Sequence, residues 1–373
     1  MTSRERLLNA VLRKPVDRVP ISTYELVPYG GGWHNDDPSY ASLMAFIREH
    51  TDVMMMWGPR GIGGGLGYFV SATQEVQAEG RSWQEGESTH HEVIVHTPKG
   101  PLRHRSRTDP NVHTAWAYER FAKTDDDIER VLSVPYVPNT CDASGMSAAL
   151  EQLGDRGILL ISIGDPVCHV SELFRFEDFM MRAFTDRASI ERLLDAYYPR
   201  VYDWLRAMLE QGVGPLFRIC GAEYVTPPYL PPDLFRAFVV KYTQPLIELI
   251  HQHGCYARVH CHGRIGRVME MIAEMGADAT DPVEPPPCGD ATLAEVQRAI
   301  GDRVCLMGGM ELRDLEWGTP ESIDRLVREA IESAGPTGYV LMPTAAPINT
   351  PLRPQTERNY RAFIEAGLKY GQM

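Results

Sequence analysis

Two histidines separated by one residue carry the clearest chemical signal in this 373-residue sequence. His260 and His262 end a short apolar run, and Gly263 follows them and allows a tight turn. Residues two apart in a β-strand point to the same side, so both imidazoles are expected to project together while Cys261 points away. A His-x-His pair holds zinc or another divalent ion when a carboxylate or water completes the ligand set. We therefore predict a divalent metal site at His260 and His262, with zinc as the first choice.

Two other roles remain open for this histidine pair, because a motif this short is not specific. The imidazoles could bind an acidic substrate or transfer protons without a metal ion. They could also be structural groups that are hydrogen-bonded at the end of a strand.

Three glutamates follow other apolar runs in the same way, namely Glu223, Glu284 and Glu311. A carboxylate in such a place can complete a metal site or act as a general base, so we predict catalytic roles for these three residues. The alternative for each one is a salt bridge to an arginine, which contributes little at a surface.

Four further residues are candidates for substrate binding. Asp165 and His169 follow the apolar run at 158–163, and they add an acid and an imidazole to the same set of strand ends. Trp57 and Tyr224 are aromatic residues next to strand ends, where a ring can stack on a flat substrate. Such rings also commonly cover the edge of a core.

The elements that must position these residues alternate along the chain. Short apolar runs recur, and most are followed by amphipathic stretches; the runs are 18–23, 53–57, 158–163, 216–220, 257–261, 277–280, 304–307 and 339–342. Alternating strands and helices predict a parallel sheet, and eight strands close a (β/α)₈ barrel, in which the loops after the strands carry the chemistry. We predict one α/β barrel domain spanning residues 1–373 with an N-terminal extension, and an open doubly wound sheet is the alternative.

Three other segments stand apart from this alternation. Residues 2–12 have a polar cap and helical spacing, so a helix is expected to end before Pro15. Residues 90–107 alternate as strands do around a turn at 97–100, which predicts a β-hairpin inserted into the barrel. The glycine-rich segment 58–65 lacks the Lys-Ser/Thr ending of a phosphate-binding loop, so we interpret it as a flexible loop.

The composition limits the class of protein. Lys and Arg number 37 against 50 Asp and Glu, a net charge of −13 that argues against nucleic acid or an anionic membrane as a partner. Seven scattered cysteines without a Cys-x-x-Cys pair favour a reducing compartment, and the sequence shows neither a signal peptide nor a membrane-spanning apolar run. A cytoplasmic location is expected.

Several segments resemble the uroporphyrinogen decarboxylase superfamily over nearly the whole chain. The matching segments are 4–8, 17–20, 231–238, 250–263, 301–304 and 318–321. The resemblance is closest to the branch that contains cobalamin-dependent methyltransferases of methanol, methylamine and aryl-ether metabolism, whose hairpin is similar to residues 97–102. It implies a (β/α)₈ barrel.

Two departures from the family pattern bear on function. The porphyrinogen-binding Arg-Gln-Ala-Gly-Arg element and an aspartate after the second strand are replaced by residues 23–27 and 55–58, so decarboxylation of a porphyrinogen is not implied. The methyltransferase branch binds zinc through His-x-Cys and a later cysteine. Here His260, His262 and Ala345 stand in those places, so only harder ligands remain.

The resemblance and the histidine pair together favour a metal-assisted methyltransferase. It would move a methyl group from a small methoxylated or methylated substrate to a corrinoid protein or related acceptor, and a homodimer would be in keeping with the family. One alternative is a decarboxylase or related lyase acting on a small non-porphyrin carboxylic acid, with His260 or His262 as proton donor and arginines holding the carboxylate. A non-catalytic ligand-binding barrel is the other.

Overall fold

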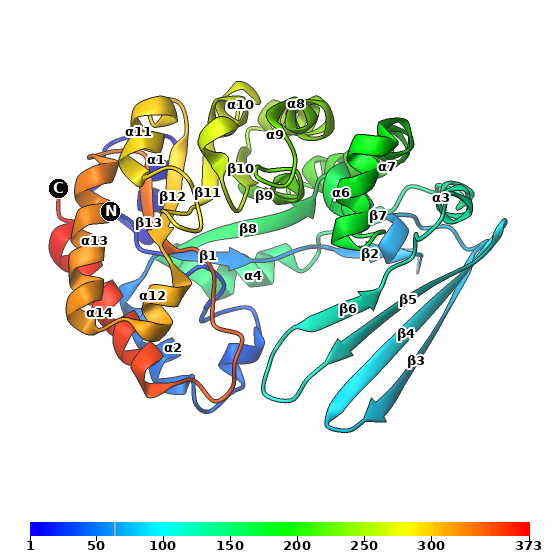
Figure 1. Cartoon of the computed structure of the whole chain (residues 1–373). Coiled ribbons are helices and arrows are strands. Elements are labelled where there is room, and N and C mark those ends of the chain that lie inside the picture. The colour runs from blue at the N-terminus through cyan, green and yellow to red at the C-terminus, as the bar shows by residue number, and fades with distance from the viewer. Residues whose placement is uncertain (63–64) are drawn as a thin grey trace.

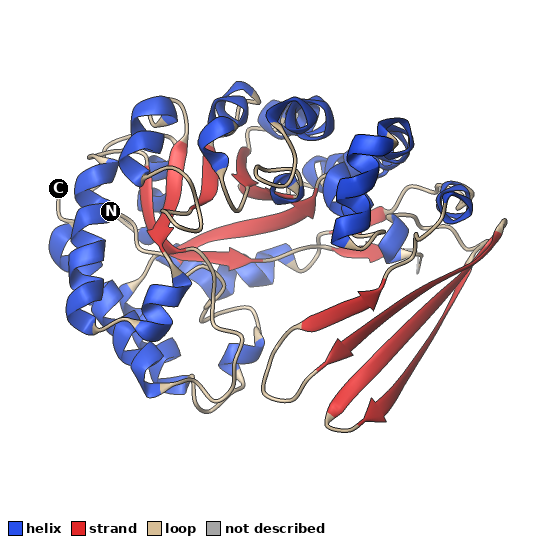
Figure 2. Ribbon diagram, in the orientation of Figure 1, coloured by secondary structure: helices blue, strands red, loops and turns tan. Residues whose placement is uncertain are grey.

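A parallel sheet with helices outside it forms the body of the molecule (Figures 1 and 2). The computed structural model describes residues 1–62 and 65–373, and within them seven parallel strands lie in the order β1-β8-β9-β10-β11-β12-β13. The strands are β1 (Val53–Met56), β8 (Gly157–Gly164), β9 (Leu216–Cys220), β10 (Tyr256–His260), β11 (Ala279–Val283), β12 (Cys305–Met310) and β13 (Tyr339–Pro343). The predicted α/β class and seven of its apolar runs are thereby confirmed, with β11 shifted a few residues toward the C-terminus.

The remaining predicted strand, 18–23, does not form. Ile21 makes only an isolated parallel bridge to Leu341, and the Ser22 N–H donates to the carbonyl of Leu341 at 2.9 Å. On the other side, the carbonyl of Ile21 accepts from the Asp52 N–H at 2.7 Å. Pro20 has no N–H to donate, so it limits the hydrogen bonds that a ladder here could contain.

Asp52 joins three parts of the chain at this end of the molecule. Its carboxylate is fully buried and accepts from Arg6 at 2.6 Å, from Arg18 at 2.7 Å and from the Ile21 N–H at 2.9 Å. Arg6 belongs to α1 (Ser3–Val11), which ends before Pro15 as predicted and begins with a capping box at Thr2. Side chains from α1 and the strands form one apolar cluster: Leu7, Ala10, Val11, Met54, Ile158, Leu160, Leu216, Ala279, Cys305, Met307, Val340 and Met342.

The remaining helices pack mostly around the outside of the sheet. They are α2 (Ala41–His50), α3 (Asp125–Leu132), α4 (Met146–Leu153), α5 (Pro166–Ser171), α6 (Phe176–Thr185), α7 (Arg187–Glu210), α8 (Pro232–Phe235), α9 (Lys241–Gln252), α10 (Met269–Glu274), α11 (Leu293–Ile300), α12 (Leu312–Trp317), α13 (Pro320–Ala334) and α14 (Pro354–Tyr370). A π-helical turn at Arg236–Val240 separates α8 from α9. Among the described residues, no helix is long and apolar enough to cross a membrane.

A four-stranded antiparallel sheet projects to one side of the parallel sheet (Figure 1). Its strands are β3 (Gln77–Glu85), β4 (Ser88–Thr97), β5 (Gly100–Thr108) and β6 (Ala115–Glu119), in that order. The predicted hairpin is β4 and β5, and the sheet extends it by one strand on each side. Val95 and Leu102 are buried and attach the sheet to the rest of the molecule. A separate pair, β2 (Arg60–Ile62) and β7 (Thr140–Asp142), takes up part of the glycine-rich segment, of which residues 63–64 lie outside the described residues.

Candidate functional site

Charged side chains occupy the interior at the carboxyl ends of three neighbouring strands. Arg258 of β10 lies beside Arg218 of β9 in the strand register, and His260 lies beside Asp281 of β11. The Arg258 guanidinium also approaches the sulfur of Met54 at 3.6 Å, which places it directly above the apolar cluster. The carboxyl ends of parallel strands are the usual place for an active site in this architecture.

An ion pair between Arg258 and Asp281 forms the deepest part of this group. Two guanidinium nitrogens of Arg258 donate to the two carboxylate oxygens of Asp281, and the residues are 1% and 0% exposed. Burial alone would raise the pKa of Asp281, but the charge of Arg258 and the hydrogen bonds to Arg258 and His260 outweigh it and hold this pKa well below its ordinary value. Asp281 is therefore a permanent anion that can orient its neighbours.

His260 is held on both of its ring nitrogens. Its Nε2 lies 2.9 Å from Nη2 of Arg218, and because a guanidinium can only donate, Nε2 accepts. Its Nδ1 therefore carries the proton and donates to Asp281 at 2.8 Å. Burial lowers the pKa of His260, and Asp281 opposes this only in part, so the imidazole is neutral.

Arg218 connects this network to the open mouth of the sheet. It donates to the Tyr24 hydroxyl at 2.6 Å and pairs with Glu25 at 3.5 Å, while its buried Nε has no hydrogen-bond partner among the residues that the structure describes. Tyr24 has a φ of +57°, a left-handed conformation that is uncommon for a residue with a side chain and that costs free energy. A buried donor without a partner suits an anionic ligand group.

His262 lies next to His260 but in a different environment. The two rings are 4.7 Å apart and nearly perpendicular, so they lie side by side as the strand alternation predicts. His262 Nδ1 donates to Glu284 at 3.0 Å, and the other Glu284 oxygen accepts from the Gly263 N–H at 2.5 Å. Gly263 has a φ of +94°, which requires glycine for the turn that brings its N–H to this carboxylate.

The ion pair between His262 and Glu284 favours the charged form of both residues, and its imidazole is partly exposed to solvent. Burial alone would lower the pKa of His262, but the hydrogen bond and charge of Glu284 outweigh it and raise this pKa above its ordinary value. The pKa of Glu284 is lowered in return. The His262 side chain is 35% exposed, and its Nε2 makes no hydrogen bond to the described part of the chain. This nitrogen can therefore donate a proton to a bound molecule.

The donor atoms do not fit the predicted zinc site. Both nitrogens of His260 are already used by Asp281 and Arg218, and a metal ion at Nε2 would meet a guanidinium cation. Cys261 points away as expected, with its buried thiol 2.9 Å from the Thr226 hydroxyl and its pKa raised by burial. Within residues 1–62 and 65–373, no group of three or more His, Cys, Asp and Glu side chains could hold a metal ion.

The other two predicted catalytic glutamates lie on either side of this pair in the strand order. Glu311, after β12, is 5% exposed; burial and the charge of Glu284 raise its pKa, and a hydrogen bond from the Cys288 side chain opposes this only in part. Oε2 of Glu311 accepts from Thr344 at 3.4 Å. Glu223, after β9, accepts from the Gly221 N–H at 2.9 Å, so its carboxylate supports the local turn.

The predicted substrate-binding residues are distributed more widely. Asp165 caps α5 by accepting from the Cys168 N–H at 2.8 Å, and burial raises its pKa to about 8. His169 lies between two cavities of about 400 and 280 Å³, and burial lowers its pKa to about 4. The hydroxyl of Tyr224 donates to Glu172 at 3.3 Å.

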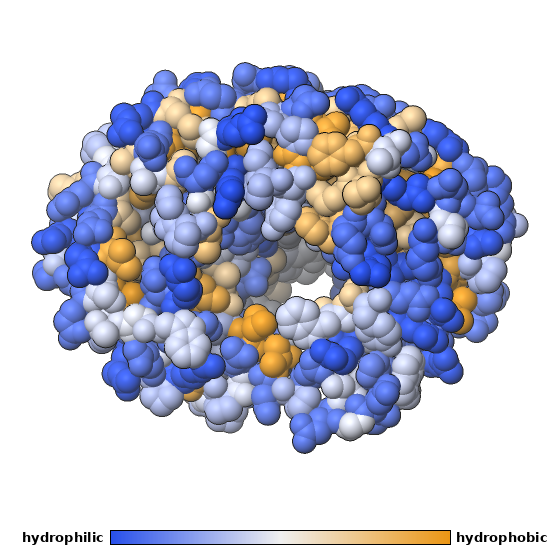
Figure 3. Space-filling view, in the orientation of Figure 1, coloured by the Kyte–Doolittle hydropathy of each residue, from blue (hydrophilic) through white to orange (hydrophobic). Residues whose placement is uncertain are grey.

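Trp57 follows β1 and faces the start of α4, because a Cβ atom built on Gly145 would lie 3.9 Å from its ring. Glu25 and the glycine segment 30–32 line another cavity of about 380 Å³. In Figure 3, the visible face is hollowed between the body of the molecule and the projecting sheet.

Four residues of the central network were not among the predicted site residues, namely Tyr24, Arg218, Arg258 and Asp281. Arg218 had a signal that could have identified it, because it is a charged residue in the middle of an otherwise apolar run. Asp281 comes directly after the predicted run 277–280, which ended too early. Nothing in the sequence around Tyr24 marks it as a partner of Arg218.

Comparisons with known proteins identify the family. The model of the uroporphyrinogen decarboxylase (URO-D) family matches residues 106–366. A curated uroporphyrinogen decarboxylase from Shewanella halifaxensis (strain HAW-EB4) is 29% identical over 171 residues, a match that spans 44% of this chain and only 45% of that relative. A solved methyltransferase from Methanosarcina mazei shares the fold, with a TM-score of 0.61 and 18% identity over 99% of both chains. The family match covers well over half of the sequence, and this chain therefore belongs to the uroporphyrinogen decarboxylase family.

Proposed function

We propose that this protein is a methyltransferase that takes a methyl group from a small methoxylated or methylated acid and passes it to a nucleophilic acceptor, most simply a corrinoid on a partner protein. One observation carries the proposal: an open imidazole acid, His262, packs against His260, and His260 in turn contacts a buried cation, Arg218, whose Nε has no partner among the described residues. Membership of the family and the fold shared with the Methanosarcina methyltransferase are in keeping with it. Both residues lie at the carboxyl end of the sheet, where this architecture carries its chemistry.

The proposal includes a barrel of eight elements. Residues 20–22 would occupy the eighth position, because they make backbone hydrogen bonds to β13 on one side and to Asp52, just before β1, on the other. In such a closed ring, the charged network would lie directly above the apolar cluster that contains Met54.

In this proposal Arg218 binds the carboxylate of the substrate. Its Nε supplies a donor that no described residue uses, and its other contacts to Tyr24 and His260 fix the guanidinium in place. Asp281 acts one step further away, because it keeps His260 in the tautomer that accepts from Arg218. The carboxylate is thereby held at one side of the mouth, with the methoxy oxygen toward His262.

His262 supplies the proton that the leaving group needs. As the methyl group moves to the acceptor, the methyl–oxygen bond breaks and its electron pair stays on the oxygen, which takes the proton from His262 Nε2. Glu284 holds the imidazolium through Nδ1 and raises its pKa, so the charged form is available near neutral pH. Proton donation thus takes the place of a Lewis acid at the oxygen.

A second candidate, decarboxylation of a small acid, uses the same two residues. Arg218 would hold a carboxylate, and His262 would protonate the carbon after carbon dioxide leaves. The free Nε of Arg218 and the match to a curated decarboxylase favour this candidate.

The products distinguish the two candidates. Chelator-treated protein is incubated with a panel of methoxylated benzoic acids and reduced free cobalamin, and demethylated acid, methylcobalamin and carbon dioxide are measured. The proposal expects the first two products, their persistence after chelation, and their loss in His262→Gln. Carbon dioxide without methylcobalamin would instead support the decarboxylase, and a requirement for added zinc would contradict proton donation by His262.

His50→Gln is the matched control for this assay. His50 lies at the end of α2, and its side chain is 32% exposed, close to the exposure of His262. The control should retain wild-type rates, whereas equal losses in both variants would indicate an unspecific effect of removing a histidine.

A further inference from the structure

Tyr24 is held at the mouth of the sheet by a tight turn over residues 23–26. The Leu26 N–H donates to the carbonyl of Thr23 at 3.1 Å, and the Thr23 hydroxyl donates to the carbonyl of Leu26 at 2.7 Å. Leu26 is fully buried and anchors this turn. Within the turn Tyr24 keeps its left-handed φ of +57°, and backbone strain of this kind is concentrated at functional sites.

The hydroxyl of Tyr24 has a proton that no described residue accepts. Its oxygen accepts from Nη2 of Arg218 at 2.6 Å, and the guanidinium lies 5.3 Å from the centre of the tyrosine ring. A guanidinium has no acceptor atom, so the phenol proton must point elsewhere. Burial raises the pKa of Tyr24 well above its ordinary value, so the hydroxyl stays protonated through the neutral range and can donate.

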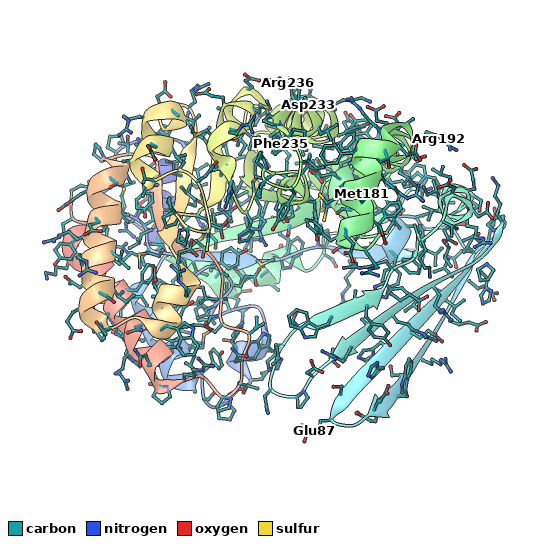
Figure 4. The ribbon with its side chains drawn as sticks, in the orientation of Figure 1. Glu87, Met181, Arg192, Asp233, Phe235 and Arg236 are labelled. Atoms are coloured by element: carbon teal, nitrogen blue, oxygen red, sulfur yellow. The ribbon has the colours of Figure 1, made fainter. Side chains whose placement is uncertain are left out.

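Arginines on the outside of the molecule differ from Arg218 in their partners. Figure 4 shows Arg192 and Arg236 at the edge of the molecule, and each of them pairs with a glutamate at 2.8 Å. The Arg218 side chain is only 9% exposed, its ion pair with Glu25 is longer at 3.5 Å, and its Nε has no partner in the described part of the chain. Arg218 and Tyr24 therefore each offer a donor without an acceptor, and the two donors belong to side chains in direct contact.

We propose that the Tyr24 hydroxyl donates a hydrogen bond to the substrate carboxylate beside Arg218 and thereby selects an acid over its neutral amide. The inference rests on the proposed function, from which it takes the carboxylate at Arg218. A carboxylate only accepts hydrogen bonds, so its two oxygens can accept from the Nε–H of Arg218 and from the O–H of Tyr24 together. The NH₂ group of a primary amide would instead meet one of these donors and leave it without an acceptor.

Calorimetric titration with 4-methoxybenzoate and 4-methoxybenzamide, in the absence of a methyl acceptor, tests this selection without turnover. The wild type should bind the acid more tightly than the amide. Tyr24→Phe keeps the ring and should weaken binding of the acid about tenfold or more, because a hydrogen bond to a charged group is lost, while binding of the amide changes less than about twofold. An unchanged affinity for the acid, or equal losses for the acid and the amide, would overturn the inference.

Tyr136→Phe is the matched control. Tyr136 is half-buried as Tyr24 is, and the Arg200 guanidinium lies 5.1 Å from the centre of its ring. Its hydroxyl already donates to Asp203 at 2.6 Å, so it has no proton to offer a ligand. This variant should bind both compounds as the wild type does, and a loss equal to that in Tyr24→Phe would show that removing a tyrosine hydroxyl acts unspecifically.

Arg218→Lys separates this inference from the function on which it rests. If Tyr24 contacts the substrate itself, Tyr24→Phe should weaken binding of the acid several-fold in the Arg218→Lys background as well. No further loss in the double variant would mean that Tyr24 acts only by holding Arg218, and would overturn the inference while the anion site stands. If neither single variant weakens binding of the acid, the carboxylate binds elsewhere and the proposed function fails too.

Discussion

His260 and His262 are neighbours in space, yet they belong to two regions with different environments. His260 belongs to a sealed network in which Asp281 and Arg258 are almost fully buried and every ring nitrogen has a partner. His262 and Glu284 form an open pair with one nitrogen facing the mouth. The difference shows that two histidines of one motif can have different roles. Burial favours the neutral form of His260, whereas the Glu284 carboxylate favours the charged form of His262.

The largest effect should come from breaking the sealed network. Asp281→Asn leaves the Arg258 guanidinium buried without its counter-ion, and such a loss costs about 3–5 kcal/mol of unfolding free energy. Urea unfolding followed by circular dichroism measures this cost. Glu284→Gln, in the open pair, should change the same quantity by less than about 1 kcal/mol, and equal losses would remove the distinction between the two regions.

The next effect concerns the proton donor. His262→Gln should lower kcat about 100-fold or more, the usual size of general acid catalysis, with little change in unfolding free energy. Steady-state kinetics on the substrate found with the panel measures it. If kcat stays within a factor of a few of the wild type, His262 is not the acid.

A smaller effect is expected at the anion site. Arg218→Lys keeps a positive charge but loses the fixed guanidinium geometry, so KM for the acid should rise about tenfold while kcat falls less. The corresponding methyl ester should show no such difference between the two proteins, because it lacks the carboxylate. An unchanged KM for the acid would place the substrate elsewhere.

The smallest effect lies in the pH dependence. A general acid is active when protonated, so kcat/KM should fall as the pH rises through the raised pKa of His262. Glu284→Gln removes the carboxylate that raises this pKa and should move the basic limb to lower pH. The same raised pKa adds stability below the unfolded value of histidine, and this stability is lost as the pH rises through the folded value. If the basic limb of the kcat/KM profile stays at the same pH in Glu284→Gln, Glu284 does not set the pKa of the catalytic acid.

Most of the fold could be predicted because parallel strands are buried on both faces and appear as apolar runs. Two elements could not. Residues 77–85 are almost entirely polar and contain no β-branched residue, so β3 depends on its neighbour β4 rather than on its own propensity. Residues 18–23 have the composition of a strand, but Pro20 reduces them to a bridge.

The part of the candidate site that is set by sequence spacing could be predicted. Alternation alone placed His260 and His262 together. The partners of His260 depend on the register between strands, which sets Asp281 beside it and Arg218 within reach, and no local pattern contains that information. The sequence therefore predicted zinc at His260, because nothing in it indicates that the Arg218 guanidinium occupies Nε2 of this histidine.

The anchoring of Asp52 bears on how this scaffold can be altered. Its buried carboxylate joins α1, the segment at Arg18 and the entry to β1, all at the end of the sheet away from the histidine pair. These contacts lie outside the proposed substrate site. Exchange of the loops around the opening would therefore change substrate binding, as proposed here, without altering the contacts of Asp52.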